Sequence, residues 1–271
     1  MREASTMDSC VKLGVCPSWW MDEPDGGDLE NYLSAAAAAE YQGVELGFRD
    51  PRGLEKASTL LRENGLELAA AVYSGSLSTT PYEREEKAMA AHAETVGRLE
   101  GDSLVFEDAA WARALRSGGP GRDLVREYAE KMTTMAGFLR ERFGVTLVYR
   151  HHGEGDAVDL SRELLLETGD DVGFSLDIGA LCGMDADLIR ALGRRIRLLH
   201  VARPNALGDA PFTGGKKTRK DAGRVGVFLA DIEYSGWVMA EQSRAAYSAF
   251  FFERHEVVRD VRHHAIPWWE V

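Results

Sequence analysis

The sequence has no long apolar segment and few cysteines. No run of apolar residues approaches the roughly 18 that a membrane-spanning helix needs, so no transmembrane segment is predicted. Residues 1–10 lack a basic stretch followed by an apolar core, so we expect a frayed extension, no secretory signal and a cytoplasmic protein. The three cysteines, an odd number without CxxC spacing, exclude a disulfide framework.

Positive charge is also scarce. A formal net charge of -12 at pH 7 repels phosphate backbones, which argues against a protein that binds nucleic acid. One basic cluster, KKTRK at 216–220, lies in a glycine-rich stretch. It predicts a solvated loop, with a site for an anionic ligand or partner as the alternative.

No segment rich in proline or serine divides the chain, which predicts one domain over residues 1–271. Short β-branched runs alternate with longer stretches of helical periodicity. The predicted strands cover 11–16, 43–48, 66–73, 103–107, 145–152, 172–179, 196–202 and 237–242. The predicted helices cover 28–42, 53–65, 82–99, 123–143, 158–168, 185–195 and 245–262, with Asp28 as an N-cap and Gly65 as a C-cap.

Strands that each lead into a helix need parallel pairing with right-handed crossovers. The closed arrangement of eight such units is the α/β fold called the (β/α)8 or TIM barrel. The seventh unit is shortened, because only residues 227–234 could form helix before the last strand. A doubly wound open sheet is the alternative, but the first strand runs into CPSWWMDEP where that fold has a glycine-rich phosphate-binding turn. We therefore expect no nucleotide cofactor.

Charged residues lie in or at the ends of the predicted strands, although strands buried on both faces should be apolar. They are Glu45, Glu107, Arg150, His151, His152, Asp177, His200 and Glu241. A buried charge without a partner shifts its pKa or costs several kcal/mol, so these groups need partners. Since a barrel carries its active site at the C-terminal ends of its strands, the sequence predicts a functional site there.

Three of these residues come from successive strands and form a candidate metal site. Asp177, His200 and Glu241 combine two carboxylates with one imidazole, a set that suits Mn, Co, Fe or Zn. The absence of thiolates argues against a structural zinc. The alternative is that all three serve the fold, as a turn cap, a satisfied core histidine and one member of an ion pair.

The chain resembles the xylose isomerase-like sugar isomerases and epimerases, and within them the inosose dehydratases, in a series of ordered segments. These are VKLGVCPSWWMDEP, AEYQGVELGFRDP, NGLELAAAVYSGSL, LVFED, GVTLVYRHHGEG, VGFSLDIGALCGMDADLI, IRLLHVAR and YSGWVMAEQS, which together span nearly the whole chain. The resemblance implies a barrel whose divalent metal, often Mn or Co, holds the carbonyl and hydroxyl oxygens of a polyhydroxy ketone. It implies Asp177, His200 and Glu241 as ligands of that metal.

The chain also departs from the family. Arg150 stands where many members place a glutamate ligand at the end of the fifth strand. Ala180 replaces a histidine, Ala202 a lysine and Arg203 an aspartate that the family commonly has. These substitutions put the family's reaction in question.

The alternation of side chains along a strand bears on the substitution at Arg150. It puts Arg150 and His152 on one face of the fifth strand and His151 on the other. An inward-pointing Arg150 about 4 Å from a divalent ion would be repelled by roughly 8 kcal/mol at an effective dielectric of 20. Either Arg150 turns away and His152 becomes the fourth ligand, or Arg150 replaces the metal as the cation that neutralises Asp177 and Glu241. A guanidinium could also bind a carboxylate or phosphate of the substrate.

Several other residues are candidates for the site. Glu107 ends a strand and could act as acid or base, or could only form an ion pair or cap a helix. Cys16 and Cys182 lie near the expected mouth of the barrel and are read as inert thiols. Candidates for contact with the substrate are Trp20, His151, Arg203 and Glu45.

The sequence thus predicts an isomerase, an epimerase or a dehydratase (lyase) that abstracts a proton beside the carbonyl of a small polyhydroxy ketone or cyclitol, assisted by Mn, Co or Zn. Glu241 or His152 would take the proton, and Glu107 or a histidine would return it or protonate a departing hydroxyl. One alternative is a metal-free barrel of a specialised biosynthetic pathway that uses Arg150 as its cation. Another is a non-catalytic partner subunit. The tail PWWEV suggests docking on the barrel or on a second copy, so a homodimer is a further hypothesis.

Overall fold

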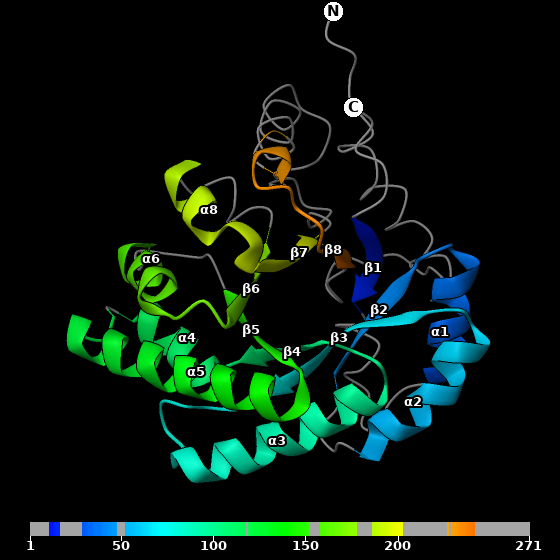
Figure 1. Cartoon of the computed structure of the whole chain (residues 1–271), viewed down its shortest axis with the longest axis horizontal. Helices are drawn as coiled ribbons and strands as arrows, with labels where there is room; N and C mark the ends of the chain where they lie inside the picture. The colour runs from blue at the N-terminus through cyan, green and yellow to red at the C-terminus, as the bar shows by residue number, and fades with distance from the viewer. Residues whose placement is uncertain are drawn as a thin grey trace, which may run out of the picture.

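Eight parallel strands form a closed barrel in the computed structural model of the chain, which describes residues 11–16, 29–47, 52–117, 119–151, 158–177, 186–202, 227 and 229–241 (Figure 1). The strands pair in sequence order, and β1 pairs with β8 to close the barrel. They are β1 Lys12–Cys16, β2 Gly43–Gly47, β3 Glu67–Ser74, β4 Ser103–Glu107, β5 Thr146–His151, β6 Val172–Asp177, β7 Ile196–Ala202 and β8 Trp237–Glu241. The predicted TIM barrel is confirmed, and every predicted strand is present with its ends shifted by two residues at most.

Helices surround the barrel on its outside (Figure 1). They are α1 Leu29–Ala38, α2 Arg52–Glu63, α3 Tyr82–Arg98, α4 Ala109–Arg116, α5 Arg122–Phe143, α6 Val158–Glu167 and α8 Ala186–Leu192, with the short 3-10 helix η1 Gly193–Arg195 before β7. Between β7 and β8, residues 227 and 229–231 are helical, in keeping with a shortened seventh unit. The predicted helix at 245–262 and the predicted cap Asp28 lie outside the described residues. In the described part of the chain, no helix is long and apolar enough to cross a membrane.

One helix boundary and one additional helix differ from the prediction for identifiable reasons. The first helix was expected to reach residue 42 but ends at Ala38, because Gln42 bonds to β1 instead: its N–H donates to the Leu13 carbonyl at 2.9 Å, and its Oε1 accepts from the Leu13 N–H at 2.8 Å. Helix α4 was not predicted. It begins after Asp108, whose side chain accepts a hydrogen bond from the Trp111 N–H at 2.8 Å and so supplies the N-cap. The predicted C-cap Gly65 has a φ of +66° after α2, a conformation that favours glycine.

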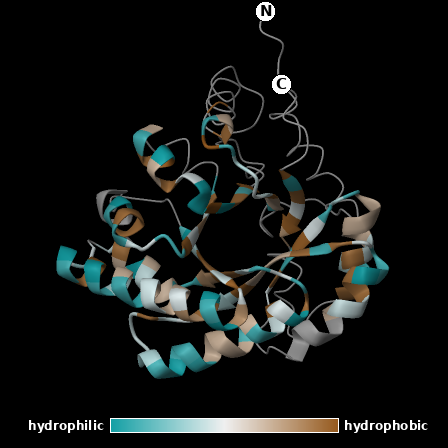
Figure 2. Ribbon diagram, viewed as in Figure 1, coloured by the Kyte–Doolittle hydropathy of each residue, from teal (hydrophilic) through white to brown (hydrophobic). Residues whose placement is uncertain are grey.

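The larger core lies between the strands and the helices. Apolar faces of the helices pack on the outward-facing side chains of the strands, while their polar faces point away (Figure 2). Within this layer the rings of Trp111 and Tyr128 stack in parallel, with centroids 4.0 Å apart. This burial of apolar area on one stripe of each helix fixes the helices around the barrel.

A smaller core fills the middle of the barrel. It consists of Ala69, Ala70, Val105, Val148, Leu198 and Met239. Large residues of β8 fill the space beside glycines of β1 and β2. A Cβ at Gly43 of β2 would lie 2.5 Å from the ring of Trp237, and one at Gly14 of β1 would lie 2.6 Å from the sulfur of Met239. The interior below the C-terminal ends of the strands is therefore a packed core and not a pore.

The seam between β1 and β8 is continuous. Five residue pairs align along it, from Lys12 opposite Trp237 to Cys16 opposite Glu241. It joins the first and the last described strands and carries both their C-terminal residues to the same end of the barrel. We call that end the mouth and the N-terminal end the floor.

Candidate active site

The alternation of β5 points Arg150 into the barrel. Val148, two residues earlier, belongs to the inner core, whereas Leu147 and Tyr149 belong to the outer one. His151 shares the parity of Tyr149 and is buried, so it lies on the helix side of the strand. The opposite orientations expected for Arg150 and His151 are present, and His152 lies outside the described residues.

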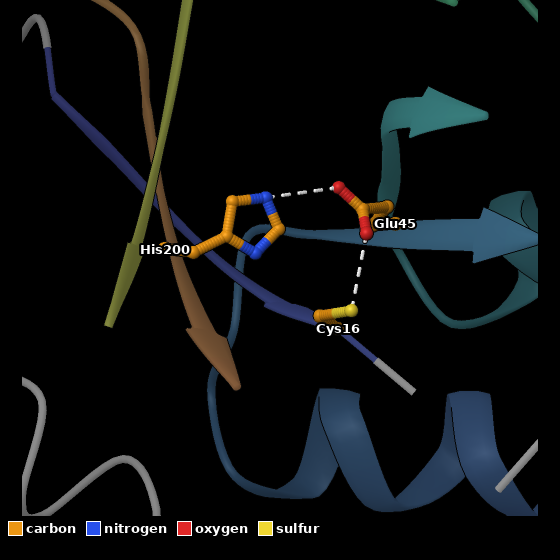
Figure 3. A group of neighbouring side chains, drawn as sticks. All are labelled: Cys16, Glu45 and His200. Carbon is orange, nitrogen blue, oxygen red and sulfur yellow. Dashed lines mark hydrogen bonds and ion pairs between the residues drawn. The ribbon is translucent and has the colours of Figure 1, made fainter. Parts of the chain in front are cut away.

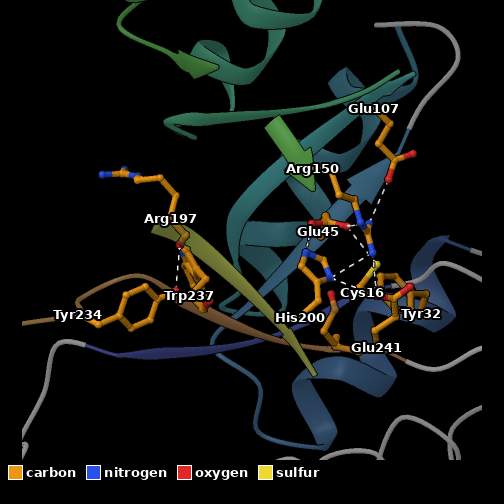
Figure 4. Close-up of polar contacts among 11 residues, drawn as sticks. Cys16, Tyr32, Glu45, Glu107, Arg150, Arg197, His200, Tyr234, Trp237 and Glu241 are labelled. Atoms are coloured by element: carbon orange, nitrogen blue, oxygen red, sulfur yellow. Dashed lines mark hydrogen bonds and ion pairs between the residues drawn. The ribbon is translucent and has the colours of Figure 1, made fainter. Parts of the chain in front are cut away.

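Three carboxylates surround the guanidinium of Arg150 (Figure 4). Nη2 donates to Glu241 Oε2 at 2.7 Å, and Nη1 donates to Glu107 Oε1 at 3.1 Å. Nη1 also lies 3.6 Å from Glu45 Oε1. The Arg150 side chain is 11% exposed, so these charges are largely shielded from water. Burial of this kind requires the charge compensation that the carboxylates provide.

Beneath the guanidinium, Cys16 and His200 lie on either side of Glu45 (Figure 3). The Cys16 thiol donates to Glu45 Oε1 at 3.1 Å, and His200 Nε2 forms an ion pair with Glu45 Oε2 at 3.3 Å. All three side chains are buried. We refer to Cys16, Glu45, Glu107, Arg150, His200 and Glu241 together as the mouth network.

His200 lies between two carboxylates. Its Nδ1 is 3.2 Å from Glu241 Oε2, on the opposite side of the ring from Glu45. Burial and the nearby Arg150 would each lower the pKa of His200, but the charge of Glu45 and the hydrogen bonds with Glu241 and Glu45 outweigh them and raise it to about 9. Arg150 Nη2 also approaches Nδ1 at 3.4 Å, but a protonated Nδ1 donates to Glu241 and cannot accept from Arg150.

The carboxylates respond in the opposite direction. Burial alone would raise the pKa of Glu241, but the hydrogen bond with His200 and the charge of Arg150 lower it to about 2. Burial alone would also raise the pKa of Glu45, but the contacts with His200 and the charge of Arg150 lower it below its usual value. The pKa of the Cys16 thiol is raised well above its usual value by burial and by the charges of Glu45 and Glu241, so this thiol is neutral.

The structure brings some of the predicted site residues together and not others. Arg150, Glu107, Glu241, His200 and Glu45 meet in the mouth network, while His151 faces the helices. Glu45, expected to contact substrate, is 1% exposed and supports Arg150 and His200. Asp177 ends β6 opposite His200 in the strand register. Outside the described residues lie Trp20, His152, Cys182 and Arg203.

Cys16 is the member of the network whose place the sequence reading missed. It was treated as a thiol near the mouth with no role. A signal was available, because Cys16 and Glu241 end the first and last strands of a barrel that must close on itself. Residues that end paired parallel strands share a layer, so Cys16 belongs beside Glu241.

Potential metal ligands are close together in the network and form ion pairs there, although Glu45 Oε2 and His200 Nε2 are buried without a hydrogen-bond partner among the described residues. Cys16, Glu45 and His200 each offer a ligand atom, and these atoms lie within 4.8 Å of one another. Both ring nitrogens of His200 face carboxylates, and Oε1 of Glu45 accepts from the thiol. A dication there would also stand beside the Arg150 guanidinium, so the donor set does not fit a divalent metal while Arg150 holds this position.

A family model matches most of the chain. The model is described as the xylose isomerase-like TIM barrel and aligns with residues 33–264. Among characterised relatives, the inosose dehydratase of Clostridium perfringens (strain 13) is 30% identical over 213 residues, which cover 72% of this chain and 71% of the relative.

Solved structures share the fold at lower identity. The crystal structure of an IOLI protein with a binding zinc atom has a TM-score of 0.73 at 12% identity and covers 96% of this chain and 98% of the other. The D-psicose 3-epimerase of Clostridium cellulolyticum H10, solved with D-tagatose, has a TM-score of 0.68 at 15% identity with the same coverage of 96% and 98%. These two likenesses describe the barrel alone.

Proposed function

Because the chain belongs to the xylose isomerase-like TIM-barrel family, we propose that it is an isomerase, an epimerase or a dehydratase that abstracts a proton beside the carbonyl of a small polyhydroxylated ketone or cyclitol. The relative named above as inosose dehydratase supports this class of reaction, and the structurally similar D-psicose 3-epimerase shows that the same barrel can carry it. The mouth network supports it independently, since it collects acid, base and cation at the end of the barrel that carries catalysis in this fold.

One observation carries the proposal: two partly accessible carboxylates flank a single guanidinium. Glu241 and Glu107 contact the two terminal nitrogens of Arg150, and their side chains are 19% and 27% exposed. A carbonyl compound bound at the guanidinium therefore has one carboxylate on each side. That arrangement gives a base and an acid for a single substrate.

The steps follow from these positions. Glu241 takes the proton from the carbon beside the carbonyl, and the electron pair of the broken C–H bond forms the C=C bond of an enediolate. The former carbonyl oxygen becomes an anion, which a neighbouring positive charge stabilises. Return of a proton to the same carbon from the other side gives epimerisation. Return to the former carbonyl carbon, with the proton of the neighbouring hydroxyl moving to the first oxygen, gives isomerisation. If the enediolate instead expels a hydroxyl group from the next carbon, Glu107, after taking up a proton from solvent, donates that proton to the departing group, which leaves as water.

The low pKa of Glu241 shapes its role as a base. At a pKa of about 2 the carboxylate is ionised at any working pH but accepts protons weakly. Oε2 contacts both Arg150 and His200, and in the proposed reaction Oε1 takes the proton. A substrate oxygen that draws the guanidinium away from Oε2 raises the basicity of Glu241 when the proton must move.

A divalent metal is the second candidate for assisting this chemistry. It is favoured by the zinc atom bound in one similar structure and by the spacing of Cys16, Glu45 and His200. The position of Arg150 opposes it, because a dication about 4 Å away would be repelled by roughly 8 kcal/mol. Mn, Co or Zn stays a prediction, and each step above uses side chains of the chain itself.

Exchange of substrate hydrogen with solvent deuterium tests the proposal. We expect the protein to incorporate deuterium beside the carbonyl of at least one member of a panel of inososes and ketoses, followed by mass spectrometry. Glu241→Gln should slow this exchange by about 10²- to 10⁴-fold, because it removes the base. Glu67→Gln is the matched control, since Glu67 pairs with Lys12 at the floor, half-exposed. Exchange at the wild-type rate in Glu241→Gln would rule out Glu241 as the base, and no exchange with any member would exclude the proposed reaction.

A further inference from the structure

Arg150 occupies the centre of the mouth network, where a catalytic cation is needed. Its two terminal nitrogens contact Glu241, Glu107 and Glu45, which come from β8, β4 and β2. The guanidinium thus links three strands across the mouth. We propose that Arg150 is the resident cation of this site, that it excludes a divalent metal from the network, and that it stabilises the enediolate directly.

The charge balance of the network favours this assignment. Three glutamates face one arginine and one histidine, and the histidine lies between two of the glutamates. Every carboxylate of the network therefore already has a cationic neighbour. A divalent ion would have to displace a buried guanidinium from three carboxylates, or else share them with it at close range.

The geometry also keeps Arg150 from turning out of the mouth. Its side chain lies on the inner face of β5, above Val148 of the inner core, and is nearly buried. Among the described residues, rotation toward solvent would leave Glu45, which is 1% exposed, with His200 and the Cys16 thiol as its partners. Buried carboxylates that lose their counter-charge are strongly disfavoured, so the three glutamates hold the guanidinium in place.

The role of Arg150 in the reaction rests on the proposed function. A guanidinium presents several N–H donors in one plane, and two adjacent donors can bind one oxygen anion or a pair of substrate oxygens. With Glu241 on one side and Glu107 on the other, an oxygen bound at Arg150 lies next to both the base and the acid. The fixed positive charge then stabilises the enediolate oxygen without any exchangeable ion.

Metal titration tests the first part of the proposal without any need for substrate. Metal-free wild-type protein is titrated with Mn²⁺, Co²⁺ and Zn²⁺ by calorimetry, and Arg150→Glu is titrated in parallel. We expect no stoichiometric binding by the wild type and one equivalent bound by Arg150→Glu, with affinity at least about tenfold higher, because this substitution removes the cation and adds a carboxylate ligand. Arg197→Glu is the matched control: Arg197 also pairs with a carboxylate at 2.7 Å, that of Asp102, but at the floor. It should gain no binding.

Stoichiometric binding by the wild type, as tight as in Arg150→Glu, overturns the proposal, and so does equal binding by Arg197→Glu. If Arg150→Glu does not fold, the absorption spectrum of wild-type protein with added Co²⁺ decides. Bands from a thiolate–cobalt bond that disappear in Cys16→Ser would place a metal in the network and exclude Arg150 as the resident cation, while the spectrum of free cobalt supports the proposal. Either result is independent of the deuterium exchange, so failure of the cation assignment is distinguishable from failure of the proposed reaction.

Discussion

The two ends of the barrel hold ion pairs of similar length in very different surroundings. At the mouth, Arg150 lies 2.7 Å from Glu241 and is 11% exposed, with two further carboxylates in contact. At the floor, Arg197 lies 2.7 Å from Asp102, with the two side chains 38% and 62% exposed. Water can replace a partner at the floor but not at the mouth. The distance between two charges therefore says little about their importance, and burial decides it.

This difference indicates what each end contributes. Exposed pairs such as Arg197 with Asp102, or Lys12 with Glu67, are compatible with ordinary surface stability. A largely shielded set of three carboxylates, an arginine and a histidine adds little stability over an apolar core of the same volume. Its presence at the mouth is better explained by catalysis than by folding.

Removal of the arginine at each end should give the largest contrast. We expect Arg150→Met to lower the free energy of unfolding by roughly 3–5 kcal/mol, because it leaves buried carboxylates without their counter-charge. Arg197→Met should lower it by only about 0–1 kcal/mol. Urea denaturation of both variants and the wild type measures the difference. Equal losses would mean that the mouth network is as well solvated as the floor.

The second-largest difference between mouth and floor should appear in the pH dependence of stability. The pKa of His200 is about 9 in the folded protein and about 6.5 when the chain is unfolded, so its protonation stabilises the fold fully below pH 6.5. That stabilisation, at most roughly 3 kcal/mol, is lost as the pH rises from 6.5 through 9. The groups that face the ring are Glu45, Glu241 and Arg150.

Denaturation of the wild type and of His200→Gln at pH 6.5, 8 and 9 measures this loss. The variant should lose less stability over the range, because the histidine is absent. Lysine, arginine and carboxylate side chains ordinarily titrate outside this range, so the floor pairs should not contribute. A wild type and a variant with the same pH dependence would contradict the raised pKa.

The smallest expected effect on stability comes from packing, and here the floor is the more sensitive end of the barrel. Gly43 and Gly47 lie at opposite ends of β2. A Cβ at Gly43 would meet the Trp237 ring at 2.5 Å and the Glu67 carbonyl at 2.8 Å, whereas one at Gly47 would meet only Val72, at 3.8 Å. We expect Gly43→Ala to cost roughly 1–3 kcal/mol by overpacking and Gly47→Ala to have little effect. Thermal unfolding of both variants provides the test, and a Gly47→Ala variant that is the less stable of the two would contradict it.

The architecture could be predicted from the sequence because its signals are local. Alternating apolar runs and helical periodicity gave the eight strands, and the charged residues at the strand ends pointed to the mouth. Alternation along β5 also separated Arg150 from His151 correctly. These inferences need only the neighbours of a residue in the chain.

The contacts across the barrel could not be predicted in the same way. Whether Glu45 reaches Cys16 and His200 depends on the register between strands, and that register shifts at Val44/Glu45 and again at Phe174/Ser175. The sequence carries no visible sign of either shift. Which carboxylates meet Arg150 depends on the same offsets, so the sequence left two roles for Arg150 open, and the structure was needed to place its guanidinium.

The seam between β1 and β8 has a consequence for how the protein is made. Cys16 and Glu241, opposite each other in that seam, are brought together only when the last strand docks on the first. During synthesis from the N-terminus, β1 remains an open edge until β8 has left the ribosome, and such edges promote aggregation. Pairing across so long a stretch of chain is a slow folding event. A nascent chain stopped before β8 would thus lack both a closed barrel and an assembled mouth network, so the site cannot form until the whole barrel has been synthesised.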